Sequence, residues 1–545
     1  MKPWTRSLSS LFRRLDDYQR IRSEDYELSE DLSLPSPSLR RRKPHHHHKR
    51  RLSLISLLSF VQHTLTLRRI VFIASTALFF LVVGILSSGI PSTYEDVRVY
   101  ERSLPQHRIR DAVTEKIGKD GVMERVHRRK YLWFDGALWG HGLNNVLQES
   151  FVMAYVAQLS HRAYVFEDHV WSKSPLPYTI YDFALRPSRI PLNAFISGPS
   201  AGGPLPGSSN SLTRRSVSLE FFNSVCHPEE RKVLNTRDAP IDASLGRGAD
   251  EIVKWFVDRL IAFNDEPCVV VDSGGRTLFD RELFGTKRIL PIFSPLLESP
   301  ILANFAWSPL VLSAVARNFA ILQPADLSDL YPPSRHLDSD STATSGVLSG
   351  LLAVHLRRGD YSRHCRRLVG WDDEYMGVNQ FHSLPDRFEA DEYLREHRPL
   401  TDITSIVSTR NSTIPTSIPH RTAEEHAVLT PYYLEHCLPE IPAIVQRLHE
   451  VRLEYEMHSS APPSEEKYTL KRIYLLSNGW PYWLNSLRSA LKADGWEDVH
   501  VSMAVDMAIA EKAEVFVGNG FSSLSGNIVT LRLSRGFKPE SNRFL

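Results

Sequence analysis

The sequence carries almost no net charge and very little cysteine, and both shortages narrow the class of protein it can be. Its 65 Lys and Arg residues are balanced by 63 Asp and Glu residues, which leaves a formal net charge of +2. No global excess of positive charge therefore points to nucleic acid. The chain has 4 cysteines, and their spacings match no zinc pattern. With 42% hydrophobic residues, it has the composition of an ordinary globular protein with room for a large core.

The first part of the chain lacks any long apolar period. Residues 1–69 are rich in Arg, Lys, Ser and Pro, so we predict a disordered basic tail there. Four consecutive histidines, at 45–48, resemble a metal-binding tract. Their Arg and Lys neighbours would repel a cation, so we expect no metal at this tract.

Charge is absent from residues 70–90, which read IVFIASTALFFLVVGILSSGI. As a helix this segment would span about 30 Å, the thickness of a hydrocarbon core. It predicts one transmembrane helix, and a buried core helix is the alternative. Arg68 and Arg69 precede the segment, and Glu95 and Asp96 follow it. The positive-inside rule then predicts a single-pass type II protein of the endoplasmic reticulum or Golgi membrane, with its folded part in the lumen.

All the cysteines lie on the predicted lumenal side, where disulfides persist. They are Cys226, Cys268, Cys365 and Cys437. Three complete pairings are possible, and the sequence does not choose among them. Pairing Cys226 with Cys268 and Cys365 with Cys437 would close the shorter loops. A glycosylation sequon at Asn411 also suits a lumenal surface.

The lumenal part has the pattern of two layered α/β lobes. Apolar strands with Gly-rich exits alternate with helical stretches on both sides of a Ser- and Gly-rich break at 338–350. We expect two Rossmann-like lobes, with a ligand bound between them at the carboxyl ends of the strands. The predicted segments are a tail at 1–69, a transmembrane helix at 70–90, a stem at 91–129, an N-terminal lobe at 130–345 and a C-terminal, nucleotide-sugar-binding lobe at 346–545.

The strongest local signal is the run His355-Leu356-Arg357-Arg358-Gly359-Asp360, where an apolar strand ends in a turn. Arginine offers planar, permanently charged donors that suit a diphosphate. An exposed basic turn is the simpler interpretation of two arginines alone. The tripeptide from Arg358 to Asp360 also matches an adhesion motif, but the match is short and common.

Two further pieces strengthen the diphosphate interpretation. Residues 140–145, GHGLNN, join a first strand to a helix, where small residues allow close approach and helix amides attract anions. Near the C-terminus, Asp506 is followed by a strand and by the loop at 518–523, GNGFSS. Hydroxyls and amides of that loop suit phosphate, and the Asp506 carboxylate suits a base or ribose. A helix cap is the alternative role for Asp506.

Taken together and in this order, the motifs at 140–145, at 355–360 and from Asp506 to 523 resemble the fucosyltransferase superfamily that includes the protein O-fucosyltransferases and the α1,6-fucosyltransferases. The resemblance covers residues 131–172 and 350–545. It implies the two-domain GT-B fold and GDP-fucose as the donor, with the donor-binding positions at Gly140, Gly142, Asn144, Asn145, His355, Arg357, Arg358, Asp506, Ser522 and Ser523. The expected partners are GDP-fucose, a protein or glycan acceptor, and the membrane through one helix, with no nucleic acid.

The resemblance also implies transfer without a metal or other cofactor. Sugar-nucleotide enzymes that use a cation commonly carry Asp-x-Asp at a strand end. The sequence has Asp338-Ser339-Asp340, which opens a linker after a stretch with no strand pattern, so we reject it as a metal site. Arginine and a helix dipole would then neutralise the departing GDP.

We expect inverting transfer, in which an acceptor hydroxyl attacks the fucose anomeric carbon while Arg357 stabilises the leaving GDP. The base is not identified by the pattern; Asp360, Glu149 and Glu374 are the candidates. A long insertion at 373–430 is expected to shape the acceptor site. A lumenal GDP-sugar binder without activity and a GT-B transferase for another sugar nucleotide are the competing hypotheses.

Overall fold

The computed structural model describes most of the chain from residue 67 onward. The described residues are 67–87, 93–117, 123–136, 142–181, 184–205, 214–239, 248–272, 278–317, 347–359, 361–397, 421–458, 469–502 and 505–545. The predictions for residues 1–66, for the tract at 45–48 and for Gly140, Asp338, Asp340, Asp360 and Asn411 lie outside them. The chain divides into two compact units, one of residues 1–93 with 171–189 and one of residues 94–170 with 190–545.

The first unit contains helix α3 (Leu67–Ser87) and the antiparallel hairpin of β6 (Tyr178–Tyr181) and β7 (Ala184–Pro187). Helix α3 overlaps the predicted membrane span, but it begins at Leu67 and takes Arg68 and Arg69 into its first turn. Among the described residues, none of the helices combines the length and the apolar character needed to cross a membrane. The structure therefore does not support the predicted span at 70–90.

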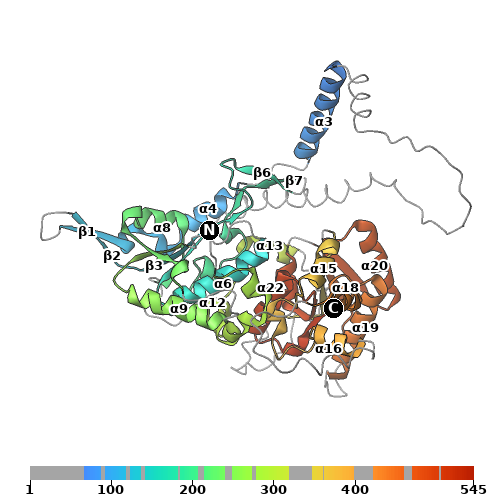
Figure 1. Cartoon of the computed structure of the whole chain (residues 1–545). Helices are drawn as coiled ribbons and strands as arrows, with labels where there is room; N and C mark the ends of the chain where they lie inside the picture. Colours follow the sequence, from blue (N-terminus) through green and yellow to red (C-terminus); the bar gives the residue numbers. More distant parts are fainter. Residues whose placement is uncertain are drawn as a thin grey trace, which may run out of the picture. The chain divides into compact units, whose positions relative to one another are not determined.

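The second unit contains two parallel sheets (Figure 1). The N-terminal sheet has the order β10-β11-β3-β4-β9. Its strands are β3 (Tyr131–Asp135), β4 (Ala163–Phe166), β9 (Val217–Ser218), β10 (Arg231–Asn235) and β11 (Cys268–Asp272). The near-continuous apolar run of β11 is typical of a parallel strand covered on both faces. The helices of this N-terminal lobe are α6 (Leu143–Leu159), α8 (Leu219–Val225), α9 (Ala249–Ala262), α10 (Arg281–Gly285), α11 (Phe293–Leu297), α12 (Pro300–Ala303) and α13 (Pro309–Arg317).

The C-terminal sheet has the order β14-β13-β12-β15-β16. Its strands are β12 (Leu348–Leu356), β13 (Arg472–Ser477), β14 (Asp498–Ser502), β15 (Ala513–Gly518) and β16 (Asn542–Phe544). This is the Rossmann order, in which the sequence of neighbouring strands reverses between β12 and β15 while all strands stay parallel. The helices are α15 (Tyr361–Gly370), α16 (Ala390–His397), α18 (Ala423–Cys437), α19 (Ile441–His458), α20 (Pro481–Ala493), α21 (Asp506–Lys512) and α22 (Ser523–Ser534). The predicted α/β fold with parallel sheets is confirmed.

One hydrophobic core continues through both lobes. It includes Leu132 and Val269 of the N-terminal sheet together with Ala353 and Phe516 of the C-terminal sheet. A second core packs α19 and α20 against the other face of the C-terminal sheet, and a third lies beneath α8. Burial on both faces explains why the apolar strands were predictable from the sequence.

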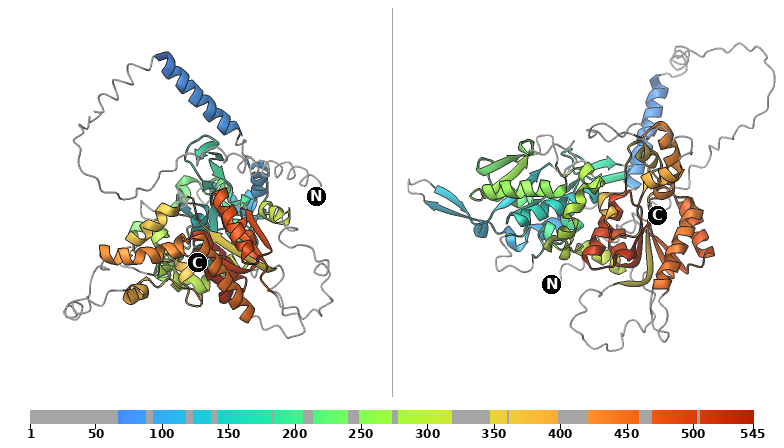
Figure 2. Two further views of the ribbon diagram at one scale, coloured as in Figure 1. Left: turned by 90° about the vertical axis from the view of Figure 1, so that its right-hand side faces the viewer. Right: turned by 60° about the horizontal axis from the view of Figure 1, so that its bottom comes forward.

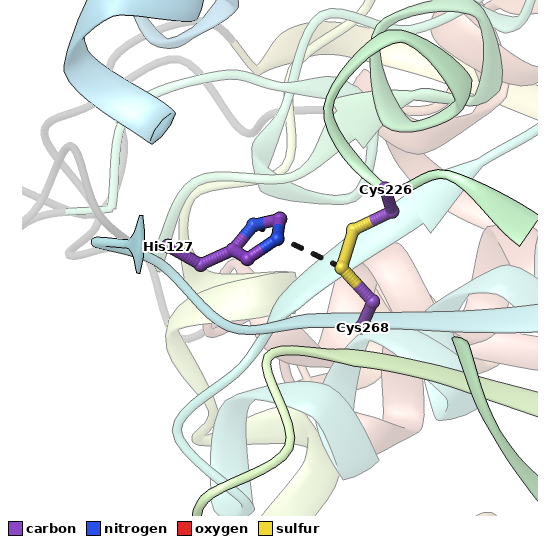
Figure 3. A group of neighbouring side chains, drawn as sticks. All are labelled: His127, Cys226 and Cys268. Atoms are coloured by element: carbon purple, nitrogen blue, oxygen red, sulfur yellow. Dashed lines mark hydrogen bonds between the residues drawn. A yellow bond between two sulfur atoms is a disulfide. The ribbon is translucent and has the colours of Figure 1, made fainter. Parts of the chain in front are cut away.

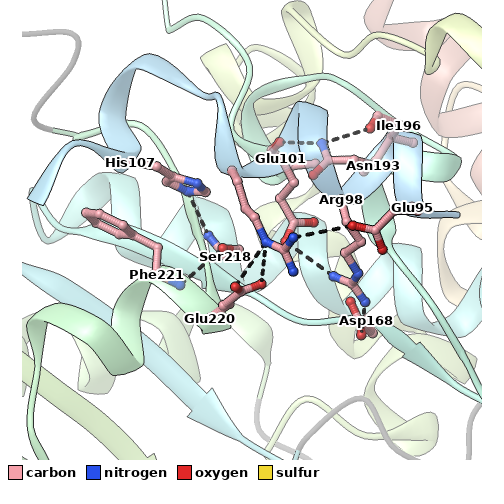
Figure 4. A network of polar contacts seen from close by, with 12 residues as sticks. Glu95, Arg98, Glu101, His107, Asp168, Asn193, Ile196, Ser218, Glu220 and Phe221 are labelled. Carbon is pink, nitrogen blue, oxygen red and sulfur yellow. Dashed lines mark hydrogen bonds and ion pairs between the residues drawn. The ribbon is translucent and has the colours of Figure 1, made fainter.

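The segment predicted as a stem folds in large part onto the N-terminal lobe. Helix α4 (Glu95–Arg102) places Arg98 against Asp168 and within 3.3 Å of Glu101 (Figure 4). Glu101 is 1% exposed, and burial raises its pKa to about 7. Charged residues that are buried in pairs resemble a solvated stretch in the sequence, which is why the predicted stem at 91–129 includes residues 94–112. Beyond them, the hairpin of β1 (Val113–Ile117) and β2 (Met123–His127) extends from the lobe (Figure 2).

Two disulfides form, Cys226–Cys268 and Cys365–Cys437, which is the pairing that closes the shorter loops. His127 lies beside the first, with its Nδ1 4.0 Å from Cys268 Sγ (Figure 3). These three residues gather potential metal ligands within 4.8 Å of one another. Because both sulfurs are joined to each other, neither offers a thiolate to a cation.

Candidate functional site

The candidate site lies where the order of the C-terminal sheet reverses. The carboxyl ends of β12 and β15 are neighbours there, with Val354 in register with Val517. Arg357 and Arg358 follow β12, and residues 519–522 join β15 to α22. Ligands of such sheets bind outside the carboxyl ends of the strands at this reversal. The predicted diphosphate residues therefore lie at the position where the fold favours a ligand.

The loop after β15 is held by side chains from several elements. Asn519 Nδ2 donates to the Cys437 carbonyl at 2.7 Å, and the Phe521 backbone N–H donates to Asn519 Oδ1 at 3.1 Å. Tyr361 Oη donates to the Phe521 carbonyl at 2.9 Å. A Cβ on Gly520 would lie 2.4 Å from the Tyr375 ring, so only glycine fits there. The loop thus has a fixed conformation, and it fixes the first turn of α22.

Ser522 is the N-cap residue of α22, and its side chain makes no capping bond. The residue is 1% exposed, and its hydroxyl has no hydrogen-bond partner within the described part of the chain. A buried hydroxyl without a partner costs free energy. The first N–H groups of a helix also lack partners within the helix and favour an anion. Ser522 and the amides after it therefore fit a phosphate group.

Arg357 directly follows β12, at the sheet reversal, and is partly exposed. Its guanidinium is 4.1 Å from the centre of the Tyr361 ring. Because Tyr361 also bonds the Phe521 carbonyl, next to Ser522, one aromatic side chain connects the arginine to the phosphate-fitting loop. Arg357 supplies a permanent positive charge, and the loop with Ser522 supplies neutral donors nearby, as a diphosphate requires.

Arg358 turns away to a different environment. Its Nη1 donates to the Leu438 carbonyl at 3.5 Å and its Nη2 to the Pro439 carbonyl, while the guanidinium lies 4.2 Å from the Trp483 ring centre. Burial lowers the pKa of Arg358. The two neighbouring arginines, which look alike in the sequence, are thus placed differently.

His355 is buried in the sheet and shares a hydrogen bond of 2.8 Å between its Nδ1 and Ser525 Oγ in the first turn of α22. Burial, followed by the positive charge of Arg357, lowers the pKa of His355 to about 3. The imidazole is therefore neutral at physiological pH. In this position it ties β12 to α22.

The N-terminal lobe brings the start of α6 to α22. Gly142 is the N-cap residue of α6, and Asn145 donates its backbone N–H to the Gly142 carbonyl at 2.9 Å. Asn144 accepts a hydrogen bond from Asn527 Nδ2 through its carbonyl at 2.8 Å. The structure thus brings Asn144 to the same helix that begins with Ser523, whereas Glu149 lies one turn further along α6 and is 2% exposed.

Asp506 begins α21 and accepts a hydrogen bond of 2.8 Å from Tyr474 Oη. Burial raises the pKa of Asp506 to about 8, although the Tyr474 bond acts in the opposite direction. Glu374, one of the three candidates for the base, pairs with Lys287 at 3.1 Å on the surface.

Sequence reasoning missed the residues that support the site. Tyr361, Asn379 and Asn527 belong to this group; Asn379 Nδ2 donates to the Gly520 carbonyl at 2.8 Å. Only Tyr361 carried a signal, because it directly follows the arginine motif. The others depend on contacts between distant parts of the chain.

No protein-family model matches the chain, and neither does any curated protein. Among solved structures, it is similar to POFUT1 in complex with GDP, with 18% identity, a TM-score of 0.38 and coverage of 76% of this chain and 98% of that one. For POFUT1 in complex with GDP-fucose the values are 16%, 0.38, 77% and 98%. For apo POFUT1 they are 16%, 0.36, 77% and 99%. At identities and TM-scores this low the likeness carries no functional argument, which rests on the residues of the site.

Proposed function

We propose that the chain is a glycosyltransferase that takes fucose from GDP-fucose and passes it to a hydroxyl of a protein or glycan acceptor. The observation that carries the proposal is the arrangement of Arg357 and Ser522 at the reversal of the C-terminal sheet. Arg357 brings a permanent charge, and Ser522 brings a buried hydroxyl without a partner in the described residues. The fucose itself comes from the motif resemblance, because a diphosphate site does not select the sugar.

The proposed reaction is inverting. The acceptor oxygen forms a bond to the anomeric carbon of fucose, the bond from that carbon to the diphosphate oxygen breaks, and GDP leaves with the electron pair. Arg357 and the first amides of α22 would stabilise the charge that develops on GDP. These groups supply the positive potential that a cation gives other enzymes, so we propose that transfer needs no metal. A carboxylate would take the acceptor proton, and Asp360, Glu149 and Glu374 remain the candidates.

We also propose a lumenal location in the secretory pathway. Its support is the pair of disulfides, Cys226–Cys268 and Cys365–Cys437, which account for every cysteine of the chain. Disulfides of this kind persist in oxidising compartments. Localisation of the tagged full-length chain, with protease protection of its C-terminal part, tests this proposal.

The functional test uses the purified full-length chain with EDTA present. Hydrolysis or transfer of fucose from GDP-fucose is expected, with little turnover of other sugar nucleotides. Turnover that requires added manganese would contradict the proposal. Tight GDP binding without turnover on any acceptor would instead favour a non-catalytic GDP-sugar binder, and preference for another sugar nucleotide would favour a different GT-B transferase.

A further inference from the structure

The turn after α18 presents three consecutive carbonyls to the candidate site. The Cys437 carbonyl accepts from Asn519 Nδ2 at 2.7 Å, in the loop after β15. The carbonyls of Leu438 and Pro439 accept from the Arg358 guanidinium, at the exit of β12. One short turn therefore holds the exits of both strands that meet at the reversal of the sheet.

This turn is anchored by the Cys365–Cys437 disulfide. Both cysteines are fully buried, and the bond joins the end of α18 to α15. Helix α15 begins with Tyr361, which bonds the Phe521 carbonyl and lies against Arg357. The disulfide thus connects two elements that both contact the loop at 519–522.

Arg358 is held on two sides. Its guanidinium meets the carbonyls of the turn, and the ring of Trp483 in α20 lies 4.2 Å away. Its backbone N–H donates to Asn478 Oδ1 at 2.8 Å. An arginine that bridges two carbonyls and stacks on an indole uses its planar fork to fix geometry.

We propose that the turn at Cys437, Leu438 and Pro439, anchored by the Cys365–Cys437 disulfide, positions the diphosphate site, and that Arg358 is a positioning residue of this device. Arg357 is then the arginine that contacts the donor. This inference rests on the proposed function for its ligand, GDP, although the contacts that carry it do not.

The first test compares two disulfides in the full-length chain. Cys365→Ser with Cys437→Ser is expected to weaken GDP binding by about tenfold, measured by calorimetry on folded protein. Cys226→Ser with Cys268→Ser is the matched control, because this disulfide lies beneath α8 in the N-terminal lobe, and it should leave the affinity within about twofold. Equal affinity in all three proteins, or equal weakening by both pairs, would overturn the inference.

The second test separates the two arginines by salt. A direct ionic contact makes GDP affinity fall as ionic strength rises. Arg357→Ala should flatten that dependence, whereas Arg358→Ala should weaken binding by about tenfold and keep the wild-type dependence. A flattened dependence in Arg358→Ala would make Arg358 a phosphate ligand and reject the inference.

The third measurement needs no ligand. The backbone amides of Phe521 and Ser522 both donate to Asn519, at 3.1 Å each. Hydrogen exchange at these amides should accelerate in the Cys365/Cys437 variant and stay unchanged in the Cys226/Cys268 variant. If the wild-type chain binds no GDP, the proposed function fails, and unchanged exchange in both variants would then reject the positioning role as well.

Discussion

Asn527 of α22 donates a hydrogen bond of 2.8 Å from its Nδ2 to the backbone carbonyl of Asn144 in α6. This bond joins the two lobes beside the N-terminal turns of both helices. Both turns carry backbone amides without helical partners, which favour negative charge. The contact therefore brings two anion-attracting helix ends to one place in the fold.

The close packing around Gly526 of α22 predicts that the fold needs glycine at this position. A Cβ at this position would lie 2.9 Å from Val378 Cγ2 and 3.1 Å from Gln148 Nε2. Gly526→Val should lower the free energy of unfolding by about 1–3 kcal/mol through overpacking, measured by urea denaturation. Gly370→Val is the control, because a Cβ there meets nothing within 4 Å. Equal stability of the two variants would show that the side chains around Gly526 can shift to admit a larger residue.

Ser522 should matter for binding and not for stability. Its hydroxyl makes no bond within the described residues, so Ser522→Ala removes no protein contact that holds the fold. We expect GDP affinity to fall by about fivefold to tenfold, the value of about one hydrogen bond, with the unfolding free energy unchanged or raised, because the variant no longer buries a hydroxyl that is unpaired in the described part of the chain. Ser534→Ala, at the other end of α22, should leave affinity unchanged. A loss of stability without a loss of affinity would make Ser522 a structural residue.

Asp506 should make the stability of the protein depend on pH. Its pKa in the folded state is about 8, against an ordinary value of 3.8, so between these values the folded state binds the extra proton. Stability should then fall as pH rises through this window, by at most about 1.4 kcal/mol per unit. Denaturation at pH 5 and pH 8 checks this, and Asp506→Asn should remove the Asp506 share of the decline. A decline of the same size in Asp506→Asn would place its cause elsewhere.

The same carboxyl should link GDP binding to proton release. If Asp506 accepts hydrogen bonds from guanosine, binding favours the ionised form. GDP affinity should therefore increase as pH rises toward 8 and level off above it, measured by calorimetry in buffers of different ionisation enthalpy. An affinity that does not change between pH 6 and pH 8 would separate Asp506 from the nucleotide.

Much of the fold was predictable because its strands are buried on both faces. The run from Leu351 to Leu356 and the run at 268–272 are apolar enough to identify without a structure. The arginine motif at the end of a strand and the Gly-rich loop at 518–523 were also predictable, since each belongs to a local strand exit. Their meeting at one sheet reversal follows from the strand order, which no local pattern contains.

The hydrogen-bond partners of the Arg358 guanidinium could not be predicted from the sequence. The carbonyls that bind its guanidinium belong to Leu438 and Pro439, about 80 positions further along the chain. Likewise, the pairing of Arg98 with Asp168 joins α4 to a distant part of the N-terminal lobe, so the local sequence of this charged segment predicts a stem. Patterns report local structure, whereas these contacts depend on tertiary packing.

The most direct test of the account is GDP binding to the full-length chain and to Arg357→Ala, measured by calorimetry with EDTA present. Loss of a charge-assisted contact is expected to weaken binding by about 1.5–3 kcal/mol, which is roughly 10-fold to 150-fold. We expect the wild-type chain to bind GDP in EDTA and Arg357→Ala to show this loss. Equal affinity of the two proteins, or binding that appears only when a divalent cation is added, would contradict it.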